Sequence, residues 1–163
     1  MNPCIKIAFF LILTSLTTGC DTGYWWSRGQ PSGVSELIQR SSERLAESVA
    51  THGPARENLS GIAVHTSKAL EKALQNIGSG AGGNQLVQLS SELKMARDSF
   101  MKMEGLISIG SRAAFSELSG QLRKFTNSAK EGQAVNPEAF GLFHARTQFF
   151  LARELMVPPP NFG

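Results

Sequence analysis

The stretch from Asn84 to Ile107, NQLVQLSSELKMARDSFMKMEGLI, carries the clearest periodic pattern in the chain. Its apolar residues recur at intervals of three and four in turn, which places them on one face of an α-helix. The pattern therefore predicts an amphipathic helix with a continuous buried seam. Gly105 and Gly110 interrupt it, and each glycine inside a helix costs about 1 kcal/mol relative to alanine. We therefore expect a break and a new helix capped by Ser111; a single kinked helix is the alternative. The seam, with spacings of three and four in turn, consists of Leu86, Leu89, Leu93, Ala96, Phe100, Met103 and Ile107.

The two segments before this stretch have helical patterns as well. The first is expected to run from near Ser32 to His52, and the second to begin near Pro54, since proline favours the first turn of a helix. The run GSGAGG at 78–83 ends the second helix. Their apolar positions are Val34, Leu37, Ile38, Leu45 and Val49 in the first, and Leu59, Ala63, Thr66, Leu70, Ala73 and Ile77 in the second.

Two helices are predicted after the stretch. The last begins with a capping Asn136, a proline in the first helical position and Glu138 in the first turn, and it runs to about Met156. Apolar residues cover much of its circumference, so we expect it to be the most buried helix. The apolar positions are Ala114, Phe115, Leu118, Leu122 and Phe125 in the fourth helix, and Phe140, Leu142, Phe143, Phe149, Phe150, Leu151 and Leu155 in the last.

These patterns predict an all-α fold. Strand-like alternation is not sustained anywhere, and short connections favour antiparallel neighbours, so we expect an up-down bundle of four to five helices over residues 34–157, followed by a Pro-rich tail at 158–163. The composition, 41% hydrophobic and 18% charged, is that of a globular protein. The net charge of +3 is spread among interleaved acidic and basic residues, which argues against a nucleic-acid partner.

The N-terminus has the three-part layout of a secretory signal peptide. Lys6 precedes an unbroken apolar run, Ile7 to Leu13, and small and polar residues follow it up to Cys20. A helix that crosses a bilayer needs about 20 apolar residues, so this run is too short to span.

The cleavage region resembles that of bacterial lipoproteins, whose pattern is an aliphatic residue, two small residues and a cysteine. Thr17, Thr18, Gly19 and Cys20 fill these places, with Leu16 one position early. The resemblance implies that residues 1–19 are a signal peptide and that Cys20 carries lipid at a bacterial membrane, facing the periplasm. Asp21 resembles an inner-membrane retention signal. The alternative is an ordinary signal peptide followed by an unpaired cysteine.

Residues 20–33 are expected to form a lipidated tether. Tyr24, Trp25 and Trp26 follow Cys20 closely, and tyrosine and tryptophan favour the boundary between membrane and water. We therefore predict that these three residues contact the membrane interface, while the alternative is that one tryptophan folds back onto the helical domain.

Several short motifs match known chemistry without the context that this chemistry needs. Gly78, Gly80 and Gly83 match a dinucleotide-binding pattern, but a helix rather than a strand precedes them. Ser91 and Lys94 match the S-x-x-K pattern of penicillin-binding proteins, whose other motifs are missing from the sequence. Met101 and Met103 are two residues apart, so a helix points them in different directions.

The three histidines, His52, His65 and His144, lie on different predicted helices and form no metal-binding motif. We expect His144 to be a surface or hydrogen-bonded residue. The sequence therefore predicts a non-enzymatic, lipid-anchored envelope protein without a metal or cofactor, which binds a protein partner as an accessory, scaffold or exclusion factor. The alternative is a periplasmic carrier of a small apolar ligand or of non-covalent haem, with His144 as a haem ligand.

Overall fold

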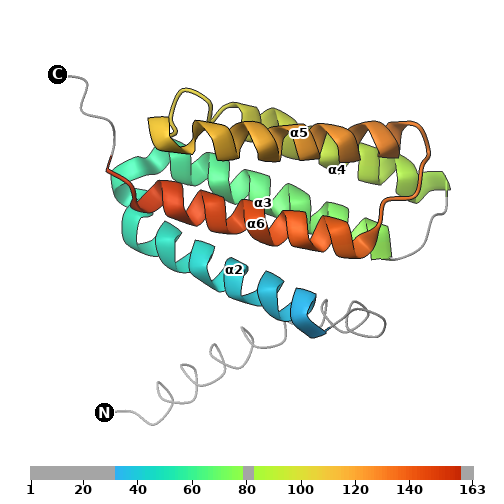
Figure 1. The fold of residues 1–163 in the computed structure, drawn as a ribbon, viewed down its shortest axis with the longest axis horizontal. Coiled ribbons are helices and arrows are strands. Elements are labelled where there is room, and N and C mark those ends of the chain that lie inside the picture. The colour runs from blue at the N-terminus through green and yellow to red at the C-terminus, as the bar shows by residue number, and fades with distance from the viewer. Residues whose placement is uncertain (1–31, 79–82, 159–163) are drawn as a thin grey trace, which may run out of the picture.

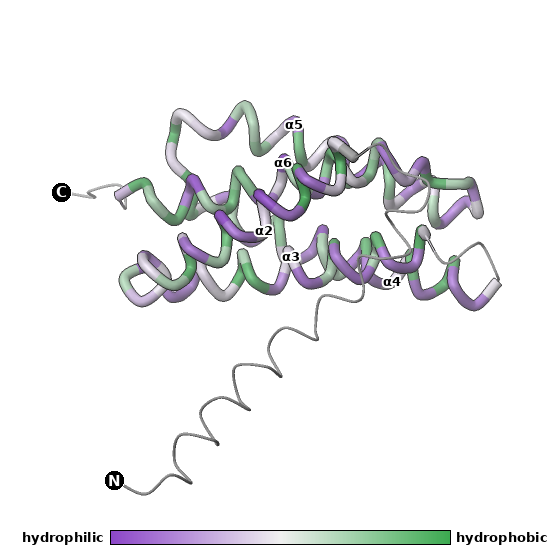
Figure 2. Tube along the Cα trace, turned by 90° about the horizontal axis from the view of Figure 1, so that it is seen from below, coloured by the Kyte–Doolittle hydropathy of each residue, from purple (hydrophilic) through white to green (hydrophobic). Residues whose placement is uncertain are grey.

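The computed structural model describes residues 32–78 and 83–158, and all regular structure in these ranges is helical. Because these ranges contain no strand, the all-α prediction is confirmed. Hydrophobic and hydrophilic residues alternate along each helix (Figure 2), as expected for amphipathic helices. The elements in chain order are α2 (Ser32–His52), the 3-10 helix η3 (Gly53–Arg56), α3 (Glu57–Gly78), α4 (Gly83–Met101), the 3-10 helix η4 (Ile109–Ser111), α5 (Arg112–Lys130) and α6 (Pro137–Met156) (Figure 1).

The predicted cap of α6 is confirmed, whereas that of α5 is wrong. Asn136 Oδ1 accepts a hydrogen bond of 3.0 Å from the backbone N–H of Ala139, and Pro137 occupies the first turn. Ser111 precedes α5, but its side chain makes no capping hydrogen bond. Its hydroxyl instead donates to the carboxylate of Glu154 on α6, so a tertiary hydrogen bond replaces the capping hydrogen bond.

The apolar seam of residues 84–107 extends beyond its helix. α4 ends at Met101, so the expected break is confirmed and the single kinked helix is wrong. Met103 and Ile107 are buried although they lie in the turns that follow α4. The Ile107 N–H donates to the Met103 carbonyl at 3.1 Å, which helps to hold these turns together. The spacing therefore predicts burial correctly at these two positions, but not helical conformation.

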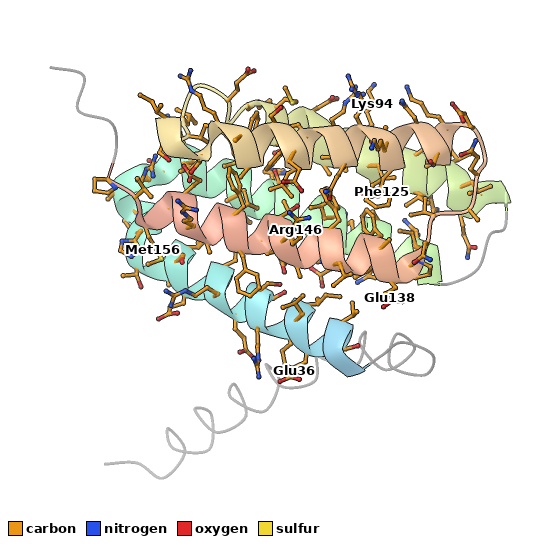
Figure 3. All side chains as sticks on the ribbon, in the orientation of Figure 1. Glu36, Lys94, Phe125, Glu138, Arg146 and Met156 are labelled. Atoms are coloured by element: carbon orange, nitrogen blue, oxygen red, sulfur yellow. The ribbon has the colours of Figure 1, made fainter. Side chains whose placement is uncertain are left out.

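Phenylalanine rings fill the core between α4, α5 and α6. Phe100 of α4 stacks on Phe115 of α5 with ring centroids 4.8 Å apart, and it meets Phe150 of α6 at 5.9 Å. Towards the other end of α5, Phe125 lies between α5 and α6 and contacts Phe140 edge-on at 5.1 Å (Figure 3). Of the described helices, α6 has the most buried residues, as predicted.

The placement of α2 departs from the expectation that neighbours in sequence pack together. α2 packs mainly against α6, not against α3. Gln148 of α6 accepts hydrogen bonds from Ser41 and Ser42, while Arg44, further along α2, reaches Met156, further along α6. The two helices therefore run in the same direction (Figure 1). α3 runs opposite to α6, since Ser67 accepts from Gln148 and the earlier Arg56 donates to the backbone carbonyl of the later Glu154.

Candidate functional site

The site residues predicted from the N-terminal sequence lie outside the described residues. They are Cys20, Tyr24, Trp25 and Trp26. Within residues 32–78 and 83–158, no helix is both long enough and apolar enough to cross a bilayer. Any functional site that the structure shows therefore lies within these two ranges.

The motifs that resemble catalytic or metal-binding patterns do not assemble into a site. Ser91 and Lys94 are both exposed on α4, and neither lines the hollow between α3 and α4 that Glu92 and Met95 border. Met101 is exposed while Met103 is buried, so the two sulfurs do not face one ligand. Among the described residues, no group of three or more metal-binding side chains occurs.

His144 is buried, contrary to the prediction of a surface or hydrogen-bonded histidine. Its side chain is only 2% exposed, and neither ring nitrogen has a hydrogen-bond partner within the described structure. Burial lowers the pKa of His144 from 6.5 to about 4, because a charged imidazolium would lose its solvation there. The ring is therefore neutral at pH 7.

Two polar networks hold α6 in place. In the first, Gln148 Oε1 accepts from the hydroxyls of Ser41 at 2.6 Å and Ser42 at 3.0 Å, and Gln148 Nε2 donates to Ser67 Oγ at 3.0 Å. This amide joins α2, α3 and α6. Because Gln148 is itself buried, each of these bonds replaces one to water that the side chain has lost.

The second network lies at the C-terminal end of α6. The buried carboxylate of Glu154 accepts from the Ser108 N–H at 2.9 Å and from the Ser111 hydroxyl. Arg56 donates to the carbonyls of Val157 at 2.7 Å and Leu106 at 3.1 Å. The network joins α6 to η3 and to the connection between α4 and α5. It therefore fixes the position of the C-terminal end of α6.

One face of α6 remains uncovered although this helix is otherwise the most buried. Leu142, Phe149 and Met156 are 40%, 38% and 45% exposed and recur every seven residues. Arg146 and Arg153 lie between them on the same side, so the exposed residues are spaced by four and three in turn. We call these five residues the outer stripe of α6. Arg146 lies near the middle of the helix and Met156 at its end (Figure 3).

An open groove runs beside the outer stripe, between α2 and the C-terminal half of α6. Its volume is about 460 Å³, and Arg44 from α2 lines it together with Phe149, Arg153 and Met156. The Arg44 guanidinium donates to Met156 Sδ at 3.7 Å. Exposed apolar side chains beside a concave strip are typical of a protein-binding surface. Sequence analysis missed this surface because it assigned Leu142 and Phe149 to the buried part of α6.

Comparisons with known proteins give no relative from which the role of this surface could be inferred. The chain matches no protein-family model, and no curated protein or solved structure matches it significantly.

Proposed function

We propose that the chain is a non-enzymatic, lipid-anchored envelope protein that acts by binding another protein through the outer stripe of α6. In this proposal residues 34–157 form an up-down bundle of four to five helices, and the opposite directions of α3 and α6 support it. The observation that carries the proposal is the regular recurrence of exposed apolar residues on the most buried helix. A contiguous row of exposed apolar residues bordered by polar ones is typical of an interaction surface.

The anchor belongs to the same proposal. Cys20 would carry the lipid, while Tyr24, Trp25 and Trp26 would sit at the membrane interface of the tether. Support comes from the lipoprotein-like sequence at 17–20. Asp21 favours the inner membrane and the periplasmic side. An accessory, scaffold or exclusion factor of an envelope assembly fits a small helical domain held at the membrane.

The carrier alternative has less support. The unpaired ring of His144 favours it, but small-molecule pockets have volumes of about 300–1,000 Å³. An apolar cavity lined by Ile77, Leu86, Leu89 and Val135 measures only about 80 Å³. Such a volume is too small for haem. Larger hollows of about 320–460 Å³ lie elsewhere on the surface, but His144 lines neither them nor this cavity.

Site-specific photo-crosslinking tests the proposal. A photoreactive amino acid replaces Phe149 in the full chain, expressed in the bacterium that encodes it, and Val87 is the matched control because it is an exposed apolar residue, 71% exposed, on α4. We expect a discrete protein adduct from position 149 and none from position 87. No adduct from 149, or the same adducts from both positions, would contradict the proposed surface.

Metabolic labelling with palmitate tests the anchor separately. The wild-type chain should incorporate label and Cys20→Ala should not, because the acylated thiol is lost. An unlabelled wild-type chain would refute the lipoprotein assignment.

A further inference from the structure

We infer that the partner of the outer stripe is an amphipathic helix that carries acidic residues beside its apolar face. The inference rests on the proposed function and adds the chemistry of the partner. It uses three features of the stripe: the spacing of its apolar residues, its shape and its charge.

The spacing of the apolar residues fits a helical partner. Leu142, Phe149 and Met156 recur at intervals of seven along α6, so they lie nearly in line over about 21 Å of helix. A second helix laid alongside presents apolar residues at the same interval, which is the packing used in coiled coils and in helix-in-groove recognition. The groove between Arg44 of α2 and the C-terminal half of α6 is lined by three residues of the stripe, Phe149, Arg153 and Met156.

The positive charges beside the apolar residues come from three arginines, of which Arg44 already pairs with Glu47 of α2 at 2.9 Å. Arg146 and Arg153 lie within the stripe, and Arg44 borders it across the groove. Arg153 makes no side-chain hydrogen bond or ion pair within the described structure, and Arg146 pairs at 2.8 Å with an exposed Glu117 of α5. Acidic side chains at the intervening positions of the partner would meet these guanidinium groups.

The same charges argue against two other occupants of the stripe, a second copy of the chain and an anionic bilayer. A second copy would bring arginines near arginines, since the glutamates that border the stripe, Glu47 and Glu117, already pair with Arg44 and Arg146. An anionic bilayer would satisfy the arginines, but a flat surface makes no use of a groove that lies between two helices. We therefore commit to an acidic helix.

Binding of designed peptides to the full-length acylated chain in detergent solution tests this inference. The probes are two fluorescent three-heptad peptides with leucine at the seven-residue interval, one with glutamate and one with lysine at the flanking positions. Fluorescence anisotropy measures the Kd of each at low ionic strength and at about 0.15 M salt. The variants are Arg153→Glu and Phe149→Ala, with Val87→Ala as the matched exposed apolar control.

We expect the glutamate peptide to bind at least about tenfold more tightly than the lysine peptide, with a preference that decreases as salt rises. Arg153→Glu should reverse the preference and Phe149→Ala should weaken binding about tenfold, while Val87→Ala leaves both unchanged. Retained folding of each variant is checked by its circular dichroism melt.

Equal binding of the two peptides, or no binding of either, overturns the inference. Self-association of the chain that Phe149→Ala abolishes would instead assign the stripe to a second copy. Anionic vesicles that bind the Cys20→Ala chain, with loss in Arg153→Glu, would assign it to the membrane. If position 149 still crosslinks to another protein while the peptides fail, the chemistry inferred for the partner is wrong and the proposed function stands.

Discussion

The two buried sides of α6 differ in the kind of contacts that they make. The side towards α4 and α5 is lined by aromatic rings, among them Phe140, Phe143 and Phe150. The side towards α2 is joined through Gln148 to serine hydroxyls. Aromatic packing is the stronger source of stability, whereas each polar bond contributes only about 0.5–1.5 kcal/mol net. We therefore predict that the polar bonds on the α2 side contribute less stability than the aromatic rings, although Leu45 of α2 is itself buried in the core.

Removing a ring from the aromatic side should have the largest effect. Phe100 is buried and contacts both Phe115 and Phe150, so Phe100→Ala leaves a cavity and should lower the free energy of unfolding by about 3–5 kcal/mol. Chemical denaturation monitored by circular dichroism measures this change. A loss below about 1 kcal/mol would show that the aromatic side is not the main support.

The middle of the α4 seam should be nearly as sensitive. Leu93 is fully buried, and Leu93→Ala should cost about 2–5 kcal/mol. The matched control on the same helix is Val87→Ala, which removes an exposed side chain and should change stability by no more than about 0.5 kcal/mol. Equal melting temperatures for the two variants would contradict the core assignment of Leu93.

The buried ring of His144 should give the fold a sensitivity to acid. The pKa of His144 is about 4 in the folded chain and 6.5 as the model value, so the unfolded chain binds the proton more readily. Stability from this group is therefore complete above pH 6.5 and decreases as pH falls towards 4. Between pH 7 and pH 5 the loss should be about 2 kcal/mol.

His144→Leu should remove this part of the pH dependence, because leucine has no proton to bind. Denaturation curves at pH 7 and pH 5 for wild type and variant measure the difference. An equally steep loss in His144→Leu would mean that other groups cause the acid sensitivity.

A smaller effect is expected from the amide that joins α2 to the rest. Gln148→Met keeps the size of the side chain but removes the bonds to Ser41, Ser42 and Ser67, which should cost about 1–2 kcal/mol. Hydrogen exchange should show faster opening of α2 with little change in α4 and α5. Uniformly faster exchange in all helices would show instead that α2 and the aromatic side unfold as one unit.

The difference between the two buried sides of α6 also explains which features could be predicted from the sequence. Helix positions follow from local spacing, so the seam around Leu93 and the cap at Asn136 could be recognised directly. The parallel pairing of α2 with α6 could not, because it joins segments about a hundred residues apart and contradicts the preference for neighbouring helices. Burial of His144 was missed as well, because the apolar pattern of α6 does not show which of its polar residues its neighbours cover.

The outer stripe was missed for a related reason. α6 is apolar around most of its circumference, so its sequence alone does not tell which face its neighbours leave uncovered. Leu142 and Phe149 are exposed although both α2 and α5 pack against α6. The cysteine and aromatics of the tether, Cys20 to Trp26, lie outside the described residues and remain predictions from sequence.

The adjacent residues Phe149 and Phe150 test most directly the claim that the outer face of α6 serves binding and the inner face serves folding. Phe150→Ala should lower the free energy of unfolding by about 3–5 kcal/mol, since Phe150 packs on Phe100. Phe149→Ala should change it by less than about 1 kcal/mol and weaken binding of the glutamate peptide about tenfold. A large loss of stability in Phe149→Ala, with peptide binding unchanged, would contradict the account.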